Sequence, residues 1–267
     1  MERLGPFALG PAAQQGLRVV ANYQEPADLR LGDRTLASWS VEDATGAVLF
    51  QQIVDPERQP EEFADLNVIQ RATVLYGAQR RFLFVEISYL PSAPGGGAFY
   101  YVFGLDRQGK FREMAKLIQD GKGVLNRPDA AGRIPLAEGR YLDLAVWTSW
   151  FEMTFRYAYD GGREALVPRK RCSAVAGAVF SREYLQELIA RRDNVVPVYA
   201  RPEDRTPRER IAVTPAHKIE LLQACAGAPP RQGHVDEEKV VLQIRINGKG
   251  GWVRPADFHR LGIQQAG

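Results

Sequence analysis

Residues 240–263 read VVLQIRINGKGGWVRPADFHRLGI, and this stretch decides the fold of the C-terminal part of the chain. The pattern predicts a strand, a tight turn at Asn247 and Gly248, a second strand through residues 250–253, and a short turn at residues 255–258. Asn-Gly between alternating apolar runs is the strongest short signal for a β-hairpin, because both central residues of the favoured turn need a positive φ.

The segment before this hairpin, residues 196–226, reads VPVYARPEDRTPRERIAVTPAHKIELLQACA and predicts further short strands. Together, residues 195–263 resemble the bacterial SH3-like domain, which is usually a non-catalytic attachment module of envelope or secreted proteins. The resemblance implies a small, independent SH3-like barrel. It also implies a function in binding rather than in catalysis.

The composition is that of an ordinary globular protein. Of the 267 residues, 45% are hydrophobic and 25% are charged, and the formal net charge is +3. A dedicated nucleic-acid-binding protein concentrates far more Lys and Arg on one face, so we expect no nucleic-acid partner. No apolar run approaches the ~20 residues of a membrane-spanning helix, so we expect no membrane span.

The cellular compartment is indicated only indirectly. The N-terminal sequence MERLGPFALGPAAQQG lacks the basic region and the long apolar stretch of a signal peptide, but a mature secreted chain would look the same. Because the SH3-like resemblance points to the envelope, we expect a periplasmic or extracellular protein. A cytoplasmic location is the alternative.

Residues 17–170 carry the pattern of an all-β domain. Short runs alternate between apolar and polar side chains, and turn residues separate them, as at residues 43–46 and 106–109. The run RFLFVEISYL at residues 81–90 is the strongest of these predicted strands. We expect a β-sandwich or a partial-propeller-like arrangement, with almost no helix between residues 17 and 165.

Two segments of this region also resemble the β-hairpin repeats of FG-GAP-type envelope proteins. They are the hairpin FGLDRQGKF and the later run RYAYDGG. Repeats of that family often carry an Asp-rich calcium loop. In the corresponding stretch, residues 127–144, Asp129 has no neighbouring Asp at the alternating spacing that a calcium cage requires, so we expect no calcium site.

Residues 180–193 are expected to form one helix that links the two predicted domains. Ser181 is the expected N-cap, because its hydroxyl can accept a hydrogen bond from an N–H group of the first turn. The helix carries an apolar stripe that we expect to pack one domain onto the other. The stripe consists of Tyr184, Leu185, Leu188 and Ile189.

The chain has two cysteines, Cys172 and Cys225, which allow one disulfide at most. If bonded, they would close a loop of roughly 50 residues, tie the two predicted domains together, and stabilise the fold by about 4 kcal/mol. The alternative is two separate thiols. An oxidising compartment favours the bond.

Histidine is absent from the predicted N-terminal domain. The three histidines are His217, His234 and His259, all in the C-terminal region. Nucleophilic catalysis by Ser-His or Cys-His needs an imidazole beside the nucleophile, and residues 17–170 supply none. The three histidines also lack the spacing of a zinc-ligand set. We therefore expect a protein that is not an enzyme and that holds neither a metal nor a cofactor.

A carboxylate-dependent hydrolase is the enzymatic alternative. Glu86, Asp143 and Glu152 lie in or near predicted strands. Two of them could act as general acid and base if their carboxyl groups lie about 5–9 Å apart. The interpretation that we favour is that each carboxylate faces solvent or pairs with an Arg.

The predicted binding surface lies on two long polar loops of the SH3-like region, residues 201–210 and 226–239. The resemblance implies a groove between them. Related domains often carry Trp where this chain has Val241, so we do not expect an aromatic groove for proline-rich peptides. The residues expected to contact a partner are Tyr199, Arg201, Arg205, Arg208, Asp236, Glu237 and Trp252.

The sequence thus predicts a non-enzymatic protein-binding protein of the bacterial envelope. Within this class, we expect first an immunity protein that inhibits a secreted toxin. The mixed charge of the two loops favours a protein partner over a uniformly anionic polymer. Two alternatives remain, a protein that binds cell-wall polymer or another glycan, and the carboxylate-dependent hydrolase.

Overall fold

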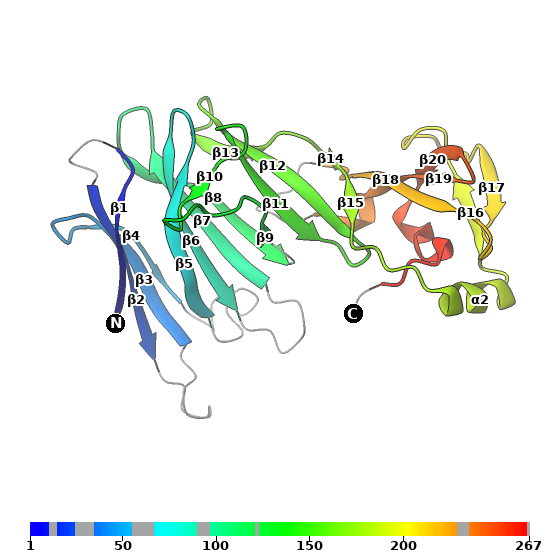
Figure 1. Cartoon of the computed structure of the whole chain (residues 1–267), viewed down its shortest axis with the longest axis horizontal. Helices are drawn as coiled ribbons and strands as arrows, with labels where there is room; N and C mark the ends of the chain where they lie inside the picture. Colours follow the sequence, from blue (N-terminus) through cyan, green and yellow to red (C-terminus); the bar gives the residue numbers. More distant parts are fainter. Residues whose placement is uncertain are drawn as a thin grey trace. The chain divides into compact units, whose positions relative to one another are not determined.

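The computed structural model of the 267-residue chain describes residues 1–10, 15–24, 35–54, 67–89, 97–120, 123–228 and 235–265. Most of the structure is strand, which confirms the predicted all-β class, and the described part of residues 17–165 contains no helix. No helix in the described part of the chain is long and apolar enough to span a membrane. The chain folds into two compact units (Figure 1).

The two units interleave along the sequence. The first unit consists of Met1–Asp143 and Tyr157–Val167, and the second of Leu144–Arg156 and Pro168–Gly267. Strands β11 (Tyr141–Trp147) and β12 (Glu152–Asp160) carry the chain from one unit to the other. They belong to a sheet of order β13-β12-β11-β9, with β9 (Gly123–Val124) and β13 (Ala165–Pro168) at its ends, and β15 (Val175–Ala176) also pairs with β12.

The first unit contains two further sheets that share a core (Figure 1). The first sheet has the order β1-β2-β3-β4, with β1 (Glu2–Ala8), β2 (Gln15–Gln24), β3 (Thr35–Glu42) and β4 (Val48–Ile53). The central sheet has the order β10-β5-β6-β7-β8, with β5 (Asn67–Tyr76), β6 (Arg81–Tyr89), β7 (Gly97–Leu105), β8 (Phe111–Asp120) and β10 (Ile134–Pro135). Strand β10 pairs with β5 in parallel, and the other neighbours in both sheets are antiparallel.

Alternating apolar side chains hold these two sheets face to face. Trp39 in β3 is almost fully buried, and its ring centroid lies 4.9 Å from those of Phe50 and Tyr101. Val41 in β3 and Val85 in β6 join the same core and expose no surface. Of the two arrangements predicted for the N-terminal region, the β-sandwich therefore describes this unit.

Strand β6 is apolar on both of its faces. Leu83 and Val85 point into the core shared with the first sheet, whereas Phe82 and Phe84 lie on the opposite face and are equally buried. The ring of Phe82 lies 6.1 Å from that of Tyr159 in β12, which covers part of this second face. A strand that is apolar on both faces needs cover on both. The central sheet is therefore the middle layer of the first unit.

The predicted hairpin at residues 106–109 joins β7 and β8 and is organised by Asp106. Its Oδ1 accepts hydrogen bonds from the N–H groups of Gln108 and Lys110 at 2.9 and 2.8 Å, and its Oδ2 lies 2.7 Å from Nε of Arg112. Burial acts to raise the pKa of Asp106. The hydrogen bonds and the guanidinium outweigh burial and hold that pKa below its usual value.

The second unit contains a four-stranded sheet of order β14-β18-β19-β20 and a two-stranded sheet of β16 and β17. The strands are β14 (Cys172–Ser173), β16 (Val195–Val198), β17 (Glu209–Ala212), β18 (Ile219–Cys225), β19 (Val241–Ile246) and β20 (Lys249–Val253). A short 3₁₀ turn, η2 (Glu237–Lys239), lies between β18 and β19, and two more, η3 (Pro255–Asp257) and η4 (His259–Leu261), follow β20.

The prediction of a closed, independent SH3-like barrel is wrong. Within the described residues, the sheets meet at an isolated bridge between Tyr199 and Trp252 and do not close into a barrel. After β16 the chain enters a loop of bends and turns, so this short strand pairs with β20 at that bridge alone. The sheet also draws β14 from outside residues 195–263.

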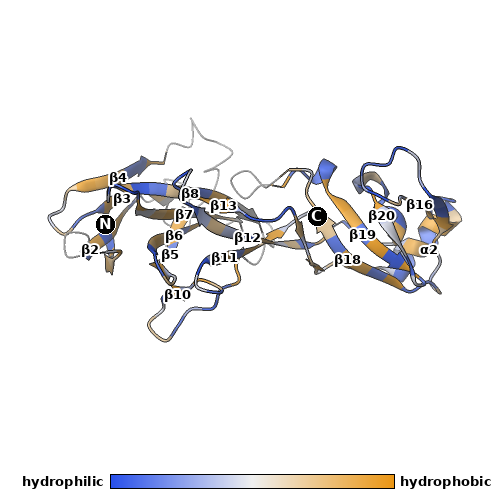
Figure 2. Ribbon diagram, turned by 90° about the horizontal axis from the view of Figure 1, so that it is seen from above, coloured by the Kyte–Doolittle hydropathy of each residue, from blue (hydrophilic) through white to orange (hydrophobic). Residues whose placement is uncertain are grey.

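The predicted Asn-Gly hairpin is confirmed. Asn247 and Gly248 have φ values of 47° and 85°, and Ile246 pairs with Lys249 across the turn. From Leu242 onward hydrophobic and hydrophilic residues alternate along β19 (Figure 2), and Leu242, Ile244 and Ile246 are buried. At Gly251 in β20 a Cβ atom would collide with the side chain of Val198, so only glycine allows β20 to approach β16 this closely.

Helix α2 (Arg182–Ala190) confirms the helix predicted at residues 180–193. Ser181 is its N-cap, and its Oγ accepts a hydrogen bond from the N–H of Tyr184 at 3.1 Å. Leu185 and Leu188 of the predicted apolar stripe are buried, and the helix contacts η4. Because η4 belongs to the second unit, this stripe packs within that unit.

Cys172 and Cys225 form a disulfide between directly paired residues of β14 and β18. Both cysteines belong to the second unit, so the bond does not tie the two halves of the chain together as we expected. A two-residue strand has too few ladder hydrogen bonds to hold itself at a sheet edge. The disulfide instead fixes β14 at that edge.

Replacing both cysteines by serine should destabilise the second unit by about 4 kcal/mol, because the bond closes a loop whose ends lie 53 residues apart. The first unit should keep its stability. Differential scanning calorimetry of the oxidised protein and of the Cys172→Ser/Cys225→Ser variant measures both transitions. Equal shifts of the two transitions would contradict a bond that acts within one unit.

Candidate functional site

The predicted partner-binding residues Tyr199 and Trp252 lie side by side in the second unit. They exchange two backbone hydrogen bonds, at 2.9 and 2.8 Å. Tyr199 is only 8% exposed, and the guanidinium carbon of Arg254 lies 4.2 Å from the centroid of its ring. The ring of Tyr199 therefore supports the loop beside it and is stacked on an arginine from its own unit.

The loop of residues 201–210 is braced along its length. Oδ2 of Asp204 accepts a hydrogen bond from the N–H of Arg201 at 2.9 Å, and the carbonyl of Asp204 accepts another from Arg254. Nη2 of Arg208 donates to the carbonyl of Gly250 at 2.7 Å. Arg208 therefore ties the loop to β20, while Arg201 and Asp204 stiffen its first turn.

Two predicted contact residues of this loop have free side chains. Arg201 and Arg205 are exposed, and within the described part of the chain neither guanidinium has an ion-pair partner. Arg208 differs, because it also donates to Oε1 of Glu209 at 2.9 Å. That hydrogen bond is the main cause that lowers the pKa of Glu209, and Lys249 adds to it. The loop thus presents Arg201 and Arg205 and uses Arg208 for its own support.

The second predicted loop, residues 226–239, is described only in part, because residues 229–234 lie outside the described residues. Asp236 pairs with Lys239 at 2.5 Å and raises the pKa of that lysine. Oε1 of Glu237 accepts a hydrogen bond from the N–H of Ser149 at 2.9 Å, so Glu237 anchors the loop to residues 148–151. The η2 turn that contains Glu237 contacts η3.

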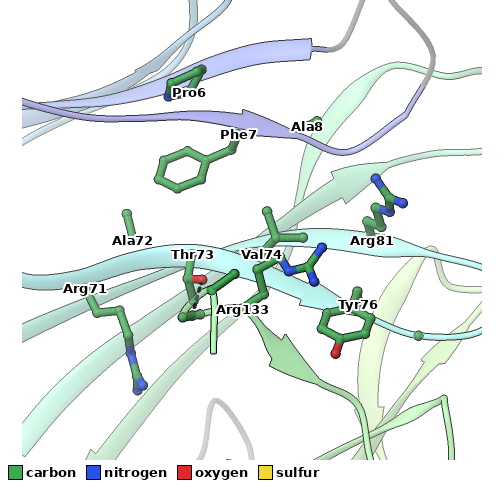
Figure 3. A pocket seen from close by; sticks show the side chains of 13 residues that line it. Pro6, Phe7, Ala8, Arg71, Ala72, Thr73, Val74, Tyr76, Arg81 and Arg133 are labelled. Atoms are coloured by element: carbon green, nitrogen blue, oxygen red, sulfur yellow. Dashed lines mark hydrogen bonds between the residues drawn. The ribbon is translucent and has the colours of Figure 1, made fainter. Parts of the chain in front are cut away.

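A different site, which the sequence did not indicate, lies in the first unit between β1 and β5 (Figure 3). It is a pocket of about 630 Å³, within the usual size range of ligand-binding pockets. We call it the arginine pocket, because three arginines and no carboxylate line it. The lining residues are Pro6, Phe7, Ala8, Arg71, Ala72, Thr73, Val74, Tyr76, Gly77, Arg81, Ala131, Gly132 and Arg133.

The three arginines differ in how they are held. Nε and Nη2 of Arg71 both donate to Oε2 of Glu86, at 3.0 and 2.7 Å. The guanidinium of Arg133 pairs with Asp129 and lies over the ring of Tyr76, 5.1 Å from its centroid. Arg81 is exposed and has no ion-pair partner within the described residues. Arg81 is therefore the cation most available to an anionic ligand.

Asp129 shapes the wall of the arginine pocket. Its Oδ1 accepts from the N–H groups of Ala131 and Arg133, both at 2.9 Å, and its Oδ2 accepts from Nε of Arg133 at 3.0 Å. Burial acts to raise the pKa of Asp129, but these hydrogen bonds and the positive charge of Arg133 hold it below its usual value. Asp129, the residue that we compared with the calcium loop of the FG-GAP-type repeats, thus closes a turn and positions Arg133.

The carboxylates of the hydrolase alternative are placed as follows. Glu86 pairs with Arg71 on the central sheet, as we favoured from the sequence. Burial and, as the smaller cause, the charge of Glu86 raise the pKa of the neighbouring Tyr100. The backbone N–H of Asp143 donates a hydrogen bond to Oδ1 of Asn126 at 2.8 Å. Glu152 is buried in β12.

The described histidines are both engaged in local contacts. Nδ1 of His217 lies 2.9 Å from Oγ1 of Thr214, and Nε2 of His259 lies 3.2 Å from Oδ2 of Asp193. His234 lies outside the described residues. In the part of the chain that the structure describes, no three His, Cys, Asp or Glu side chains gather as a metal site would require.

No protein-family model matches the chain, and no curated protein matches it in sequence. The function is therefore inferred from the geometry of the two surfaces. Sequence reasoning missed the arginine pocket because Arg71, Arg81 and Arg133 share no local motif. The nearest local signal was the pair of Asp129 and Arg133, which stand four residues apart and form an ion pair across a turn.

Replacing Asp129 by Asn keeps an oxygen acceptor for the turn but removes the charge that holds Arg133. Because the folded-state pKa of Asp129 is lowered, its ionised form stabilises the fold above the unfolded-state pKa of about 3.9, and this contribution is lost as the pH falls through the folded-state pKa. The difference in melting temperature between the protein and Asp129→Asn should therefore shrink from pH 6 to acidic pH.

Melting curves of both proteins at a series of pH values test this prediction. The remaining aspartates titrate in both proteins and cancel in the difference. A difference that stays constant on acidification would contradict the role given to the Asp129 charge.

Proposed function

We propose that this chain is a non-enzymatic binding protein that captures another protein in the bacterial envelope. An immunity protein that inhibits a secreted toxin is the particular role that we put first. The disulfide between Cys172 and Cys225 is compatible with a periplasmic or extracellular location. The proposal places the partner on the loop of residues 201–210.

The observation that carries this proposal is the braced loop itself. Rigid loops bind with a smaller loss of conformational entropy than mobile ones, because less has to be ordered on association. Arg208 and Arg254 hold the loop of residues 201–210 against Gly250 and Asp204. Held in this way, the loop presents Arg201 and Arg205 to solvent.

The charges on this loop favour a protein as the partner. Glu203 is exposed between Arg201 and Arg205, so both signs of charge alternate along the same short segment. Protein interfaces match mixed charges with complementary ones, whereas a uniformly anionic polymer would repel the carboxylate. The ring of Tyr199, stacked under Arg254, is also not open as a platform for a sugar.

Reversing Arg201 and Arg205 to Glu should slow association with the partner about tenfold and change its salt dependence, because exposed charges act mainly on the association rate. The matched control is Arg127→Glu/Arg163→Glu, which makes the same change of charge at two exposed arginines of the first unit. The partner is captured from secreted proteins of the source organism on the immobilised wild-type protein. Association rates are then measured by surface plasmon resonance.

Four outcomes are informative. An association rate that falls for the loop variant and not for the control supports the proposal. Equal rates for both variants contradict the assignment of the loop. Capture of cell-wall polymer with no protein favours the glycan-binding alternative, and turnover of peptidoglycan or peptide that is lost in Glu86→Gln or Asp143→Asn favours the hydrolase.

A further inference from the structure

The backbone of β5 has one side that faces away from β6. At the hairpin the N–H of Gly77 donates to the carbonyl of Arg80 at 2.9 Å, and the register continues with Leu75 opposite Phe82. In an antiparallel ladder, alternate residues direct both backbone groups toward the partner strand. Thr73, Leu75 and Gly77 therefore face β6, and the residues between them face the outer edge.

The outer edge of β5 is covered only at its end. The carbonyl of Tyr76 accepts a hydrogen bond from the N–H of Leu136 at 2.8 Å, which confirms that Tyr76 faces outward. Strand β10 pairs with β5 at Leu75 and Tyr76 and reaches no further. Within the described residues, the N–H of Val74 and both backbone groups of Ala72 consequently have no partner on this side.

The chain before β10 turns away from the edge instead of covering it. Oγ1 of Thr73 donates to the carbonyl of Gly132 at 2.7 Å, which holds this segment against the side-chain face of β5 (Figure 3). On the other side, Phe7 of β1 points toward Ala72 (Figure 3). The open edge of β5 thus forms the floor of the arginine pocket, between Phe7 and the turn of residues 131–133.

The neighbouring edge strand β1 is protected in a way that β5 is not. Pro6 lies in β1 and has no N–H group to donate, and the register of β1 against β2 shifts between Leu4 and Phe7. Proline and bulges are the usual devices that stop another strand from adding to a sheet edge. Residues 72–74 of β5 contain neither. Of the two edges that line the pocket, only that of β5 is suited to pair with another strand.

We propose that the outer edge of β5 at Ala72 and Val74 binds an extended acidic peptide segment of a partner protein, which adds to the central sheet as a short strand. This mode of recognition uses backbone hydrogen bonds for affinity and the flanking side chains for specificity. The segment supplies carbonyl oxygens and N–H groups at strand spacing. An isolated small anion could use only the donors and would leave the carbonyl of Ala72 unpaired.

The side chains around the edge define the sequence of the segment. Successive side chains of an added strand point to opposite faces. On the face of Phe7, Ala72 and Val74 they meet apolar groups, and on the other face they meet Arg71 and Arg133 (Figure 3). The segment therefore alternates apolar and acidic residues. Arg81 lies directly opposite Tyr76, on the same face of the sheet as Val74, and no described carboxylate neutralises it. The residue of the segment nearest Tyr76 on that face is therefore a carboxylate, which pairs with Arg81.

The test uses three short capped peptides and the full chain. In the first, valine alternates with glutamate, and the second replaces each glutamate by lysine. The third keeps the first sequence but carries N-methyl groups on alternate backbone amides, so that its charge is unchanged and its edge hydrogen bonds are lost. Binding is measured by titration, with amide NMR signals of the first unit recorded at each point.

The valine-glutamate peptide should bind with a dissociation constant on the order of 0.1 mM. Binding should shift the amide signals of Ala72 and Val74 most. The N-methylated peptide should bind at least about tenfold more weakly, since a lost factor of ten corresponds to about one good hydrogen bond. The lysine peptide should not bind.

Arg81→Glu should weaken binding of the valine-glutamate peptide several-fold, and Arg163→Glu, an exposed arginine of the same unit, should leave it unchanged. Equal binding of the plain and the N-methylated peptide would overturn strand addition, because binding would then depend on the charge of the peptide and not on its backbone hydrogen bonds. Absence of binding by the valine-glutamate peptide would overturn the proposal as a whole. This site lies in the first unit, so neither result depends on the loop of residues 201–210.

Discussion

The apolar character of both faces of β6 is the constraint on which the first unit depends. Phe82 and Phe84 on one face and Leu83 and Val85 on the other are all buried. The chain must therefore place one layer on each side of the central sheet, and it does so with the first sheet and with β12. Glu86, the carboxylate on this strand, is tolerated because Arg71 neutralises it. Where both faces are covered, a sheet can meet a partner only at its edges.

The second unit is held together differently, because its strands are short. A disulfide holds β14 to β18, and the Asn247-Gly248 turn joins β19 to β20. Residues 201–208 of the loop lie outside the strands and are braced by the side chains of Arg208 and Arg254. Both proposed binding surfaces thus leave exposed arginines for a partner, Arg201 and Arg205 in the second unit and Arg81 in the first.

Local signals in the sequence predicted local structure well. The positive φ values at Asn247 and Gly248, the Ser181 cap, and the Asp106 hairpin each follow from the chemistry of a few adjacent residues. Whether the sheets close into a barrel could not be predicted from such local signals, because closure depends on how far β16 and β17 extend. The arginine pocket was not predictable either, since β1, β5 and the turn of residues 131–133 meet only through strand order, and the sequence carries no record of that order.

The central claim is that β5 has an open outer edge in a unit whose sheet faces are covered. Hydrogen exchange of single amides, followed by NMR in the free protein, tests it most directly, because adjacent residues of one strand serve as each other's control. The N–H groups of Ala72 and Val74 should exchange about a hundredfold faster or more than those of Thr73 and Leu75, which face β6. Equal protection of all four amides would show that the edge is already covered and would contradict the account.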